Sequence, residues 1–76
     1  GIEELIKLTY FSCYDTKITT LKGIERLINL THLDCSHTSI TSLEGIEKLT
    51  NLTHLNSSVT KVTDFSMVSP NVKIIK

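Results

Sequence analysis

The chain has 76 residues, 39% of them hydrophobic, and its eight lysine and arginine residues balance eight aspartate and glutamate residues. A sequence without a basic run does not predict the cationic surface that binds nucleic acid. No apolar stretch approaches the roughly 20 residues needed to cross a bilayer, so we expect neither a nucleic-acid nor a membrane partner. The two cysteines, Cys13 and Cys35, are too few for a disulfide framework and indicate a reducing, cytoplasmic environment.

A period of 22 residues organises almost the whole chain. The word NLTHL occurs at 29–33 and again at 51–55, and glycine followed by isoleucine recurs at 1, 23 and 45. A fixed period of this length indicates a repeat protein in which successive copies stack. The last copy aligns only if about two residues are dropped between Ser66 and Pro70. We therefore expect one domain over residues 1–76, made of about three 22-residue repeats with the last one shortened, either complete or part of a longer array.

Two apolar spacings alternate within each copy. Apolar residues recur every three positions at Ile40, Leu43, Ile46, Leu49, Leu52 and Leu55. This spacing keeps them on one side of a chain of 3-10 turns, whereas they would wind around an α-helix. At Leu33 and Cys35 the spacing becomes two, which is typical of a strand. Each copy thus predicts a short strand, a turn and a return leg of tight turns, with parallel strands at 10–14, 32–36, 54–58 and 73–76.

The stretch Leu30-x-x-Leu33-x-Cys35-x-x-Thr38-x-Ile40 resembles the leucine-rich-repeat pattern L-x-x-L-x-L-x-x-N/C-x-L. The phrases TLKGIERLINLTHL and SLEGIEKLTNLTHL are similar to the 22-residue subclass found in the type-1 protein phosphatase regulatory subunit and in bacterial internalins. The resemblance implies an α/β fold, a right-handed solenoid with short parallel strands on its concave face and 3-10 turns on its convex face. It also implies a non-catalytic module that binds a protein partner, and an extracellular location if the parent is internalin-like.

Two positions depart from the family pattern. The usual buried asparagine is threonine at 16, 38 and 60, and the second strand leucine is Cys13, Cys35 or Ser57. In the family the asparagine side chains bond to backbone groups in the turn. A threonine hydroxyl can hold fewer of those bonds than an amide, so we expect a modest loss of stability.

Strand alternation predicts the side chains on the concave face. If Phe11, Leu33 and Leu55 point into the coil, their neighbours point out. The candidate partner-binding residues are Tyr10, Ser12, Tyr14, His32, Asp34, Ser36, His54, Asn56 and Ser58. In the last copy the same reasoning places Ile74 and Lys76 outward. Parallel strands about 4.8 Å apart align such residues in columns, with tyrosine as the expected anchor for a partner.

Other sites find less support in the sequence. Cys35 cannot form a catalytic array with His32 and Asp34, because it points inward and they point outward, so we expect no enzyme. His32 and His54 on adjacent strands could share a metal ion, but zinc sites take three or four protein ligands. Surface histidines are the simpler interpretation, and we expect no metal and no cofactor. Glycosylation sequons occur at Asn29, Asn51 and Asn56. Those at Asn29 and Asn51 belong to the repeat word and are interpreted as family pattern rather than as glycan sites.

The ends of the coil predict self-association. Ile2, Leu5, Ile6 and Leu8 already belong to the repeat, with no capping helix before them. At the other end Val72, Ile74 and Ile75 form an edge strand protected only by two lysines. We expect a homodimer through like ends. The alternative to a partner-binding module is therefore a structural role, as coils of a longer array or as a self-associating repeat protein.

Overall fold

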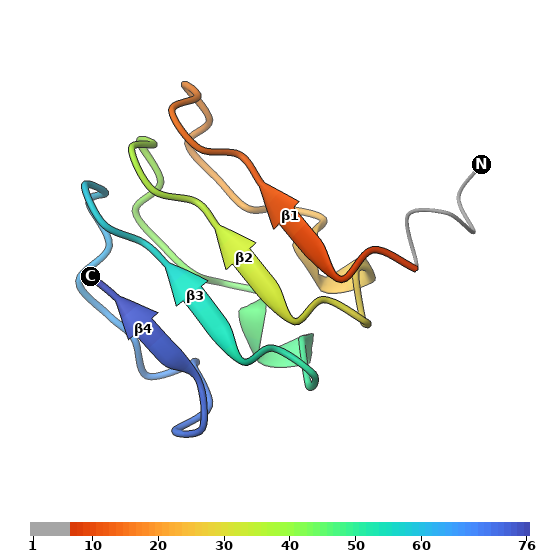
Figure 1. Cartoon of the computed structure of the whole chain (residues 1–76). Coiled ribbons are helices and arrows are strands. Elements are labelled where there is room, and N and C mark those ends of the chain that lie inside the picture. The colour runs from red at the N-terminus through yellow and green to blue at the C-terminus, as the bar shows by residue number, and fades with distance from the viewer. Residues whose placement is uncertain (1–6) are drawn as a thin grey trace.

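The chain winds into a coil whose strands form one parallel sheet (Figure 1). The computed structural model describes residues 7–76, so the repeat positions Gly1, Ile2, Leu5 and Ile6 lie outside the described residues. The four strands lie in sequence order, and each neighbouring pair is parallel. Two 3-10 helices belong to the return legs. The elements are β1 (Tyr10–Ser12), η1 (Ile24–Arg26), β2 (His32–Asp34), η2 (Ile46–Lys48), β3 (His54–Asn56) and β4 (Lys73–Ile75).

The strands start where predicted but are shorter. The first three end two residues early and β4 ends one residue early. β2 and β3 end because the side chains of Asp34 and Asn56 accept the backbone N–H groups of Ser36 (3.0 Å) and Ser58 (3.1 Å). Such a local bond competes with the ladder between strands. The copies remain joined beyond this point, since the N–H of Cys35 donates to the Asn56 carbonyl at 2.9 Å.

The return legs are 3-10 turns, as the three-residue spacing predicts. The N–H of Ile24 donates to the carbonyl of Leu21, three residues back, at 2.9 Å. η1 begins after Gly23, whose φ of 96° is a conformation that glycine adopts without steric cost. The Glu25 carboxylate accepts the Gly23 N–H at 3.1 Å. The same arrangement recurs 22 residues later in η2, so the two return legs stack with identical geometry.

The core lies between the sheet and the return legs. Leu33 and Leu55 point inward from β2 and β3 and are only 2% and 1% exposed, which confirms the predicted alternation. The other buried apolar residues are Cys13, Leu21, Ile24, Leu30, Cys35, Ile40, Leu43, Ile46, Leu49 and Leu52. The molecule measures 31 × 27 × 16 Å, and a slab this thin is a single layer of apolar side chains. The apolar side chains of each copy are therefore buried by the neighbouring copies and not within the copy itself.

Threonine hydroxyls satisfy the backbone inside the turns. Thr16, Thr38 and Thr60 donate to carbonyl oxygens three residues back, at 2.8, 2.8 and 2.7 Å. Each makes the single donated bond that a hydroxyl allows, where an amide could make two. Among residues 7–76, no buried side-chain nitrogen or oxygen lacks a hydrogen-bond partner. The shorter side chain thus leaves no buried polar side chain unsatisfied.

The register of the last copy differs from the prediction. Ile74, and not Ile75, lies opposite Leu55, so the last copy is three residues shorter than the others at its strand instead of two. The physical reason is the entry to the strand: Val72 is followed at once by the first residue of β4, whereas Leu52 is followed by Thr53 before β3 begins. Lys73 and Ile75 therefore face outward in place of Ile74 and Lys76. The Lys76 ammonium instead lies over the Phe65 ring, 4.7 Å from its centroid.

Each of the first three copies turns after its strand through a residue in the left-handed conformation. Asp15, His37 and Val59 occupy this position, with φ of 57°, 55° and 53°. Aspartate and histidine are among the residues that adopt positive φ more readily, whereas a β-branched residue is an outlier there. Val59 is also 66% exposed, so little burial of its side chain offsets the backbone strain.

We expect Val59→Asn to stabilise the fold. Asparagine tolerates the left-handed region, where most other residues lose roughly 1–2 kcal/mol, so the free energy of unfolding should rise by about 1 kcal/mol. Urea denaturation at neutral pH measures the change. Val59→Thr is the matched control, because it introduces a polar group but keeps the β-branch. Its free energy of unfolding should rise less than that of Val59→Asn. A loss of stability in Val59→Asn would contradict the proposed strain.

Candidate functional site

The outward side chains of the four strands form two rows across the sheet, which we call the sheet face. Strand register fixes the rows, because residues at equivalent positions on parallel strands lie directly beside one another. The first row is Tyr10, His32, His54 and Lys73, and the second is Ser12, Asp34, Asn56 and Ile75. Sequence reasoning identified the first three members of each row. It missed Lys73 and Ile75 because of the register of the last copy.

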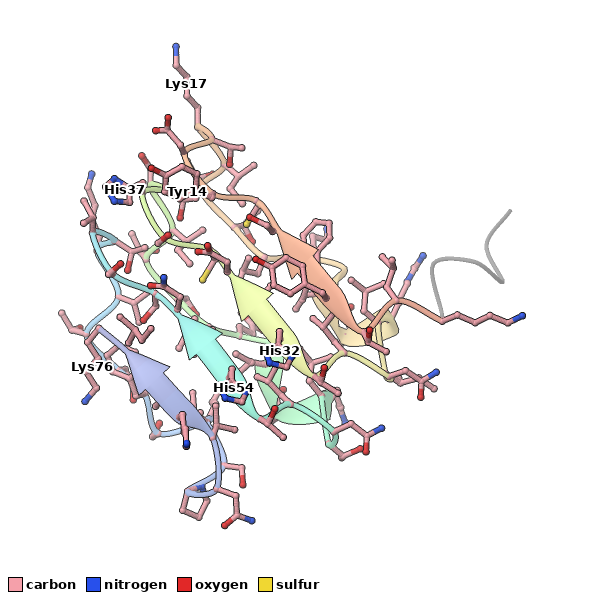
Figure 2. All side chains as sticks on the ribbon, in the orientation of Figure 1. Tyr14, Lys17, His32, His37, His54 and Lys76 are labelled. Atoms are coloured by element: carbon pink, nitrogen blue, oxygen red, sulfur yellow. The ribbon has the colours of Figure 1, made fainter. Side chains whose placement is uncertain are left out.

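His32 and His54 stack at the centre of the first row. Their ring centroids are 4.3 Å apart and their planes differ by 5°. Figure 2 shows both rings projecting from adjacent strands on the sheet face. Tyr10 continues the row, with its ring centroid 6.2 Å from that of His32 and an interplanar angle of 30°. With 60% of its surface exposed, Tyr10 is the largest aromatic group that the sheet face offers to a partner.

The neighbouring threonines hold both imidazoles in place. The Thr31 hydroxyl donates its only proton to the Thr9 carbonyl (2.9 Å), and Thr31 Oγ1 also lies 2.9 Å from His32 Nδ1. Both contacts are hydrogen bonds only if His32 Nδ1 carries a proton and donates it to Oγ1. One strand along, Thr53 repeats the arrangement at 3.1 Å to the Thr31 carbonyl and 2.8 Å to His54 Nδ1. The geometry thus places a proton on Nδ1 of both histidines.

Serine hydroxyls hold the second row. The Ser36 hydroxyl donates to Asp34 Oδ1 at 2.6 Å, and the Ser58 hydroxyl donates to Asn56 Oδ1 at 2.8 Å. Ser36 is only 2% exposed, so its expected outward position is wrong. Its hydroxyl and its N–H both bond to Asp34 Oδ1. Both serines therefore orient the row, and Ser36 contributes little surface of its own.

Tyr14 lies beyond the rows, at the turn that follows β1. Its ring contacts His37 edge-on, with centroids 5.1 Å apart. In Figure 2 this pair is at the far end of the strands from His32 and His54. Tyr14 is 53% exposed, so it extends the exposed surface past the end of the sheet without joining either row. His37 was not identified from the sequence, where nothing marks it as the neighbour of Tyr14.

The sheet face is hollowed along its middle. A depression of about 370 Å³ runs over the strands, with Tyr10 at one end, Ile75 at the other and the two histidines between them. Its lining is mainly apolar with a few polar atoms at fixed positions, which is the composition of protein interfaces and ligand sites. The depression is open, so it suits a side chain of a partner better than an enclosed small molecule.

The cysteines lie on the other side of the sheet from the histidines. Cys35 is fully buried, and its thiol points to the Asn56 carbonyl at 3.4 Å. Burial, with smaller contributions from Cys13 and Asp34, raises the pKa of the Cys35 thiol to about 12. Burial also raises the pKa of Cys13. Both thiols are free and remain protonated near neutral pH, as expected of small buried groups rather than nucleophiles.

The chain belongs to the leucine-rich-repeat family. Residues 28–70, more than half of the chain, match the family described as leucine-rich repeats in two copies. Its fold is accordingly the α/β, right-handed solenoid of that family, with parallel strands on one face and 3-10 turns on the other. Repeats of this family are in general protein-interaction modules, and that class is the one to which the fold assigns this chain.

Among solved structures, the chain is similar to the crystal structure of an internalin (inlF) from Listeria monocytogenes strain 4b F2365. The two are 29% identical, with a TM-score of 0.83. The match covers 96% of this chain but 22% of the internalin, so the chain spans a small part of that protein. No curated protein matches the sequence.

Residues 7–76 contain neither a membrane-spanning helix nor a cluster of metal ligands. That part of the chain has no helix long and apolar enough to cross a membrane. It also has no group of three or more histidine, cysteine, aspartate or glutamate side chains arranged around a common metal position.

We expect the Cys35 thiol to make stability depend on pH in alkaline solution. Above its ordinary pKa of 9.0 the thiol loses its proton in the unfolded chain, whereas the folded protein holds that proton up to a pKa of about 12. The free energy of unfolding should therefore fall between these values, by at most about 1.4 kcal/mol per pH unit from this group.

Urea denaturation at pH 8, 9 and 10 of the native chain and of Cys35→Ser isolates this contribution. Serine already occupies the equivalent position 57, where its hydroxyl donates to the Ile75 carbonyl at 3.3 Å, so the variant should fold. The free energy of unfolding of Cys35→Ser should fall less with rising pH than that of the native chain, because the variant lacks the buried thiol. Parallel curves for the two proteins would show that the thiol is not protected by burial.

Proposed function

We propose that the chain is a protein-interaction module that binds its partner on the sheet face. The observation that carries the proposal is that this face is exposed but already ordered. Four of its polar side chains are held by hydrogen bonds to neighbouring side chains: His32, His54, Asp34 and Asn56. A surface ordered in this way loses less side-chain freedom on binding than a flexible one. The repeats of residues 7–76 share one core, which supports the expectation of a single domain.

The arrangement of the face suits an anchored protein contact. Tyr10 and Ile75, both 60% exposed, offer apolar surface at the two ends of the depression. The imidazoles and amide between them offer acceptors and donors at fixed positions. Interfaces with a few such anchors surrounded by polar groups gain most of their affinity from the anchors. The partner we infer is therefore a protein that places an apolar side chain over the histidine pair.

We expect Tyr10→Ser and His54→Ser each to weaken partner binding at least tenfold, or about 1.4 kcal/mol or more. Neither side chain is part of the buried core, so unfolding curves should match those of the native chain. Affinity capture from the source cells supplies candidate partners, and titration calorimetry with each purified candidate measures binding.

Ile28→Ser is the matched control. Ile28 is 50% exposed and lies on the return leg beyond η1, so its loss removes exposed apolar surface away from the sheet face. A partner that loses affinity for Ile28→Ser and keeps it for Tyr10→Ser would move the binding site to the convex side.

A second candidate role is self-association, which the surface of the fourth copy favours. Ile74 and Val72 are only half-buried, whereas Leu55 and Leu52 at the preceding positions are buried. Ile75 is 60% exposed on the outermost strand. Apolar side chains at the end of a stack of repeats are covered by another repeat or by a second molecule, and like ends would form a closed pair.

We expect the isolated 76-residue chain to form a dimer as its concentration rises. Ile75→Lys should shift the equilibrium to monomer, because a lysine on an edge strand opposes pairing. Sedimentation velocity over a concentration series measures the equilibrium. Tyr10→Ser, on the strand at the other side of the sheet, is the control and should dimerise like the native chain. A monomer at every concentration would exclude this role for the chain.

A further inference from the structure

We propose that binding on the sheet face is sensitive to pH, because the stacked pair His32 and His54 releases an apolar side chain when acid protonates both rings. This inference rests on the proposed function, since it concerns the regulation of the same site. Histidine is the side chain whose charge ordinarily changes between about pH 5 and 8. Both rings are exposed, so protons reach them directly from solvent.

The threonines determine where the added proton goes. Nδ1 of each ring already carries the proton that it donates to the preceding threonine, so in a neutral ring the proton that acid adds enters at Nε2. The Nδ1–H bonds therefore survive the change of charge. Thr31 and Thr53 also keep their own bonds to backbone carbonyls. Acid thus charges the rings without removing the bonds that position them.

The stack brings like charges together. The ring centroids of His32 and His54 are 4.3 Å apart and their planes differ by 5°. Lys73 follows His54 in the same row. In acid the first row therefore holds three cationic side chains beside one another, whereas with neutral rings it holds one. Charges at this distance repel each other, and each of them is stabilised by water.

The other groups near the pair do not offset this charge. Asp34 is the one carboxylate of the two rows, and its Oδ1 already accepts two hydrogen bonds from a serine. Tyr10 at the end of the first row brings a phenol ring and no charge. Lys76 lies over the Phe65 ring instead of in a row. Both thiols are on the other side of the sheet and stay protonated.

The charge of the rings decides whether an apolar side chain can cover them. The two histidines line the depression between Tyr10 and Ile75. Covering a charged ring removes the hydration of an ion, which costs far more than covering a neutral polar group. A partner that places an apolar side chain over the pair is therefore held at neutral pH and released in acid.

An uncharged leucine derivative, N-acetyl-leucinamide, tests the inference without a partner, because it has no group that titrates between pH 5 and 8. Nitrogen-15 NMR of the 76-residue chain measures its binding from the shifts of the sheet-face amides. We expect its affinity to be at least tenfold lower at pH 5.0 than at pH 7.5. Circular dichroism at both pH values verifies that the chain remains folded.

A double variant, His32→Phe with His54→Phe, keeps two rings on adjacent strands that cannot take up a proton. The ratio of its affinities at the two pH values should be close to one, whatever its affinity at neutral pH. His37→Phe is the matched control and should keep the native ratio, because His37 contacts Tyr14 at the far end of the strands.

The imidazole signals give a second readout that needs no ligand. Two protonations held this close are coupled, so His32 and His54 should each titrate over a wider pH range than His37. In His54→Ala, His32 should titrate as a single independent group. Equal widths for all three histidines in the native chain would contradict the contact between like charges.

The outcomes separate this inference from the proposed function. Equal affinity of the probe at both pH values, or a pH dependence that persists in the double variant, would overturn the inference and leave the proposed function standing. Absence of probe binding at both pH values would contradict the apolar contact of the proposed function, and the inference with it.

Discussion

The parallel register between successive strands is the constraint on which the rest of the structure depends. Because β1, β2 and β3 pair residue for residue at a distance of 22, every feature of one copy lies beside the same feature of the next. The inward leucines form a core column in this way, and the outward histidines form a stack. The carbonyl of Asn56 shows how closely the copies are joined, since it accepts both the N–H and the thiol of Cys35. A change of one residue in register would exchange core and surface along a whole strand.

The sequence predicts most of the fold because its repeat states the register directly. Leucines at 33 and 55 identify the inward positions, and the three-residue spacing identifies the 3-10 turns. The strand register of the fourth copy is harder to predict, because Val72, Ile74 and Ile75 are all apolar. Hydrophobicity alone does not show which of them faces the core. The structure resolves this through the entry to β4, where Lys73 takes the backbone bond to the Thr53 carbonyl at 2.8 Å. A bond of that kind depends on chain geometry and has no signature in composition.

The candidate site was predictable in its positions and not in its chemistry. Alternation places His32 and His54 on one face. Which nitrogen of each ring carries a proton depends, however, on the hydroxyl of the preceding threonine. The signal was present in the repeated word NLTHL, in which every histidine follows a threonine. The sequence does not show, however, that the Thr31 hydroxyl donates to the Thr9 carbonyl on the neighbouring copy and so can only accept from the histidine. Ser36 shows the converse, because its sequence position suggests exposure while the structure leaves it only 2% exposed.

The same threonines connect the stability of the coil with the properties of its face. The hydroxyl protons of Thr31 and Thr53 bond to the preceding copy and so link adjacent copies. The lone pairs on the same hydroxyl oxygens accept the Nδ1–H groups of the histidines and orient the rings. A hydroxyl can do both because it donates once and accepts as well; valine would preserve the shape and lose both bonds. The core side chains beneath the sheet take no part in this arrangement. Substitutions of outward residues can therefore change what the face binds while the leucine column keeps the register, but substitutions of these threonines act on the fold and the face together.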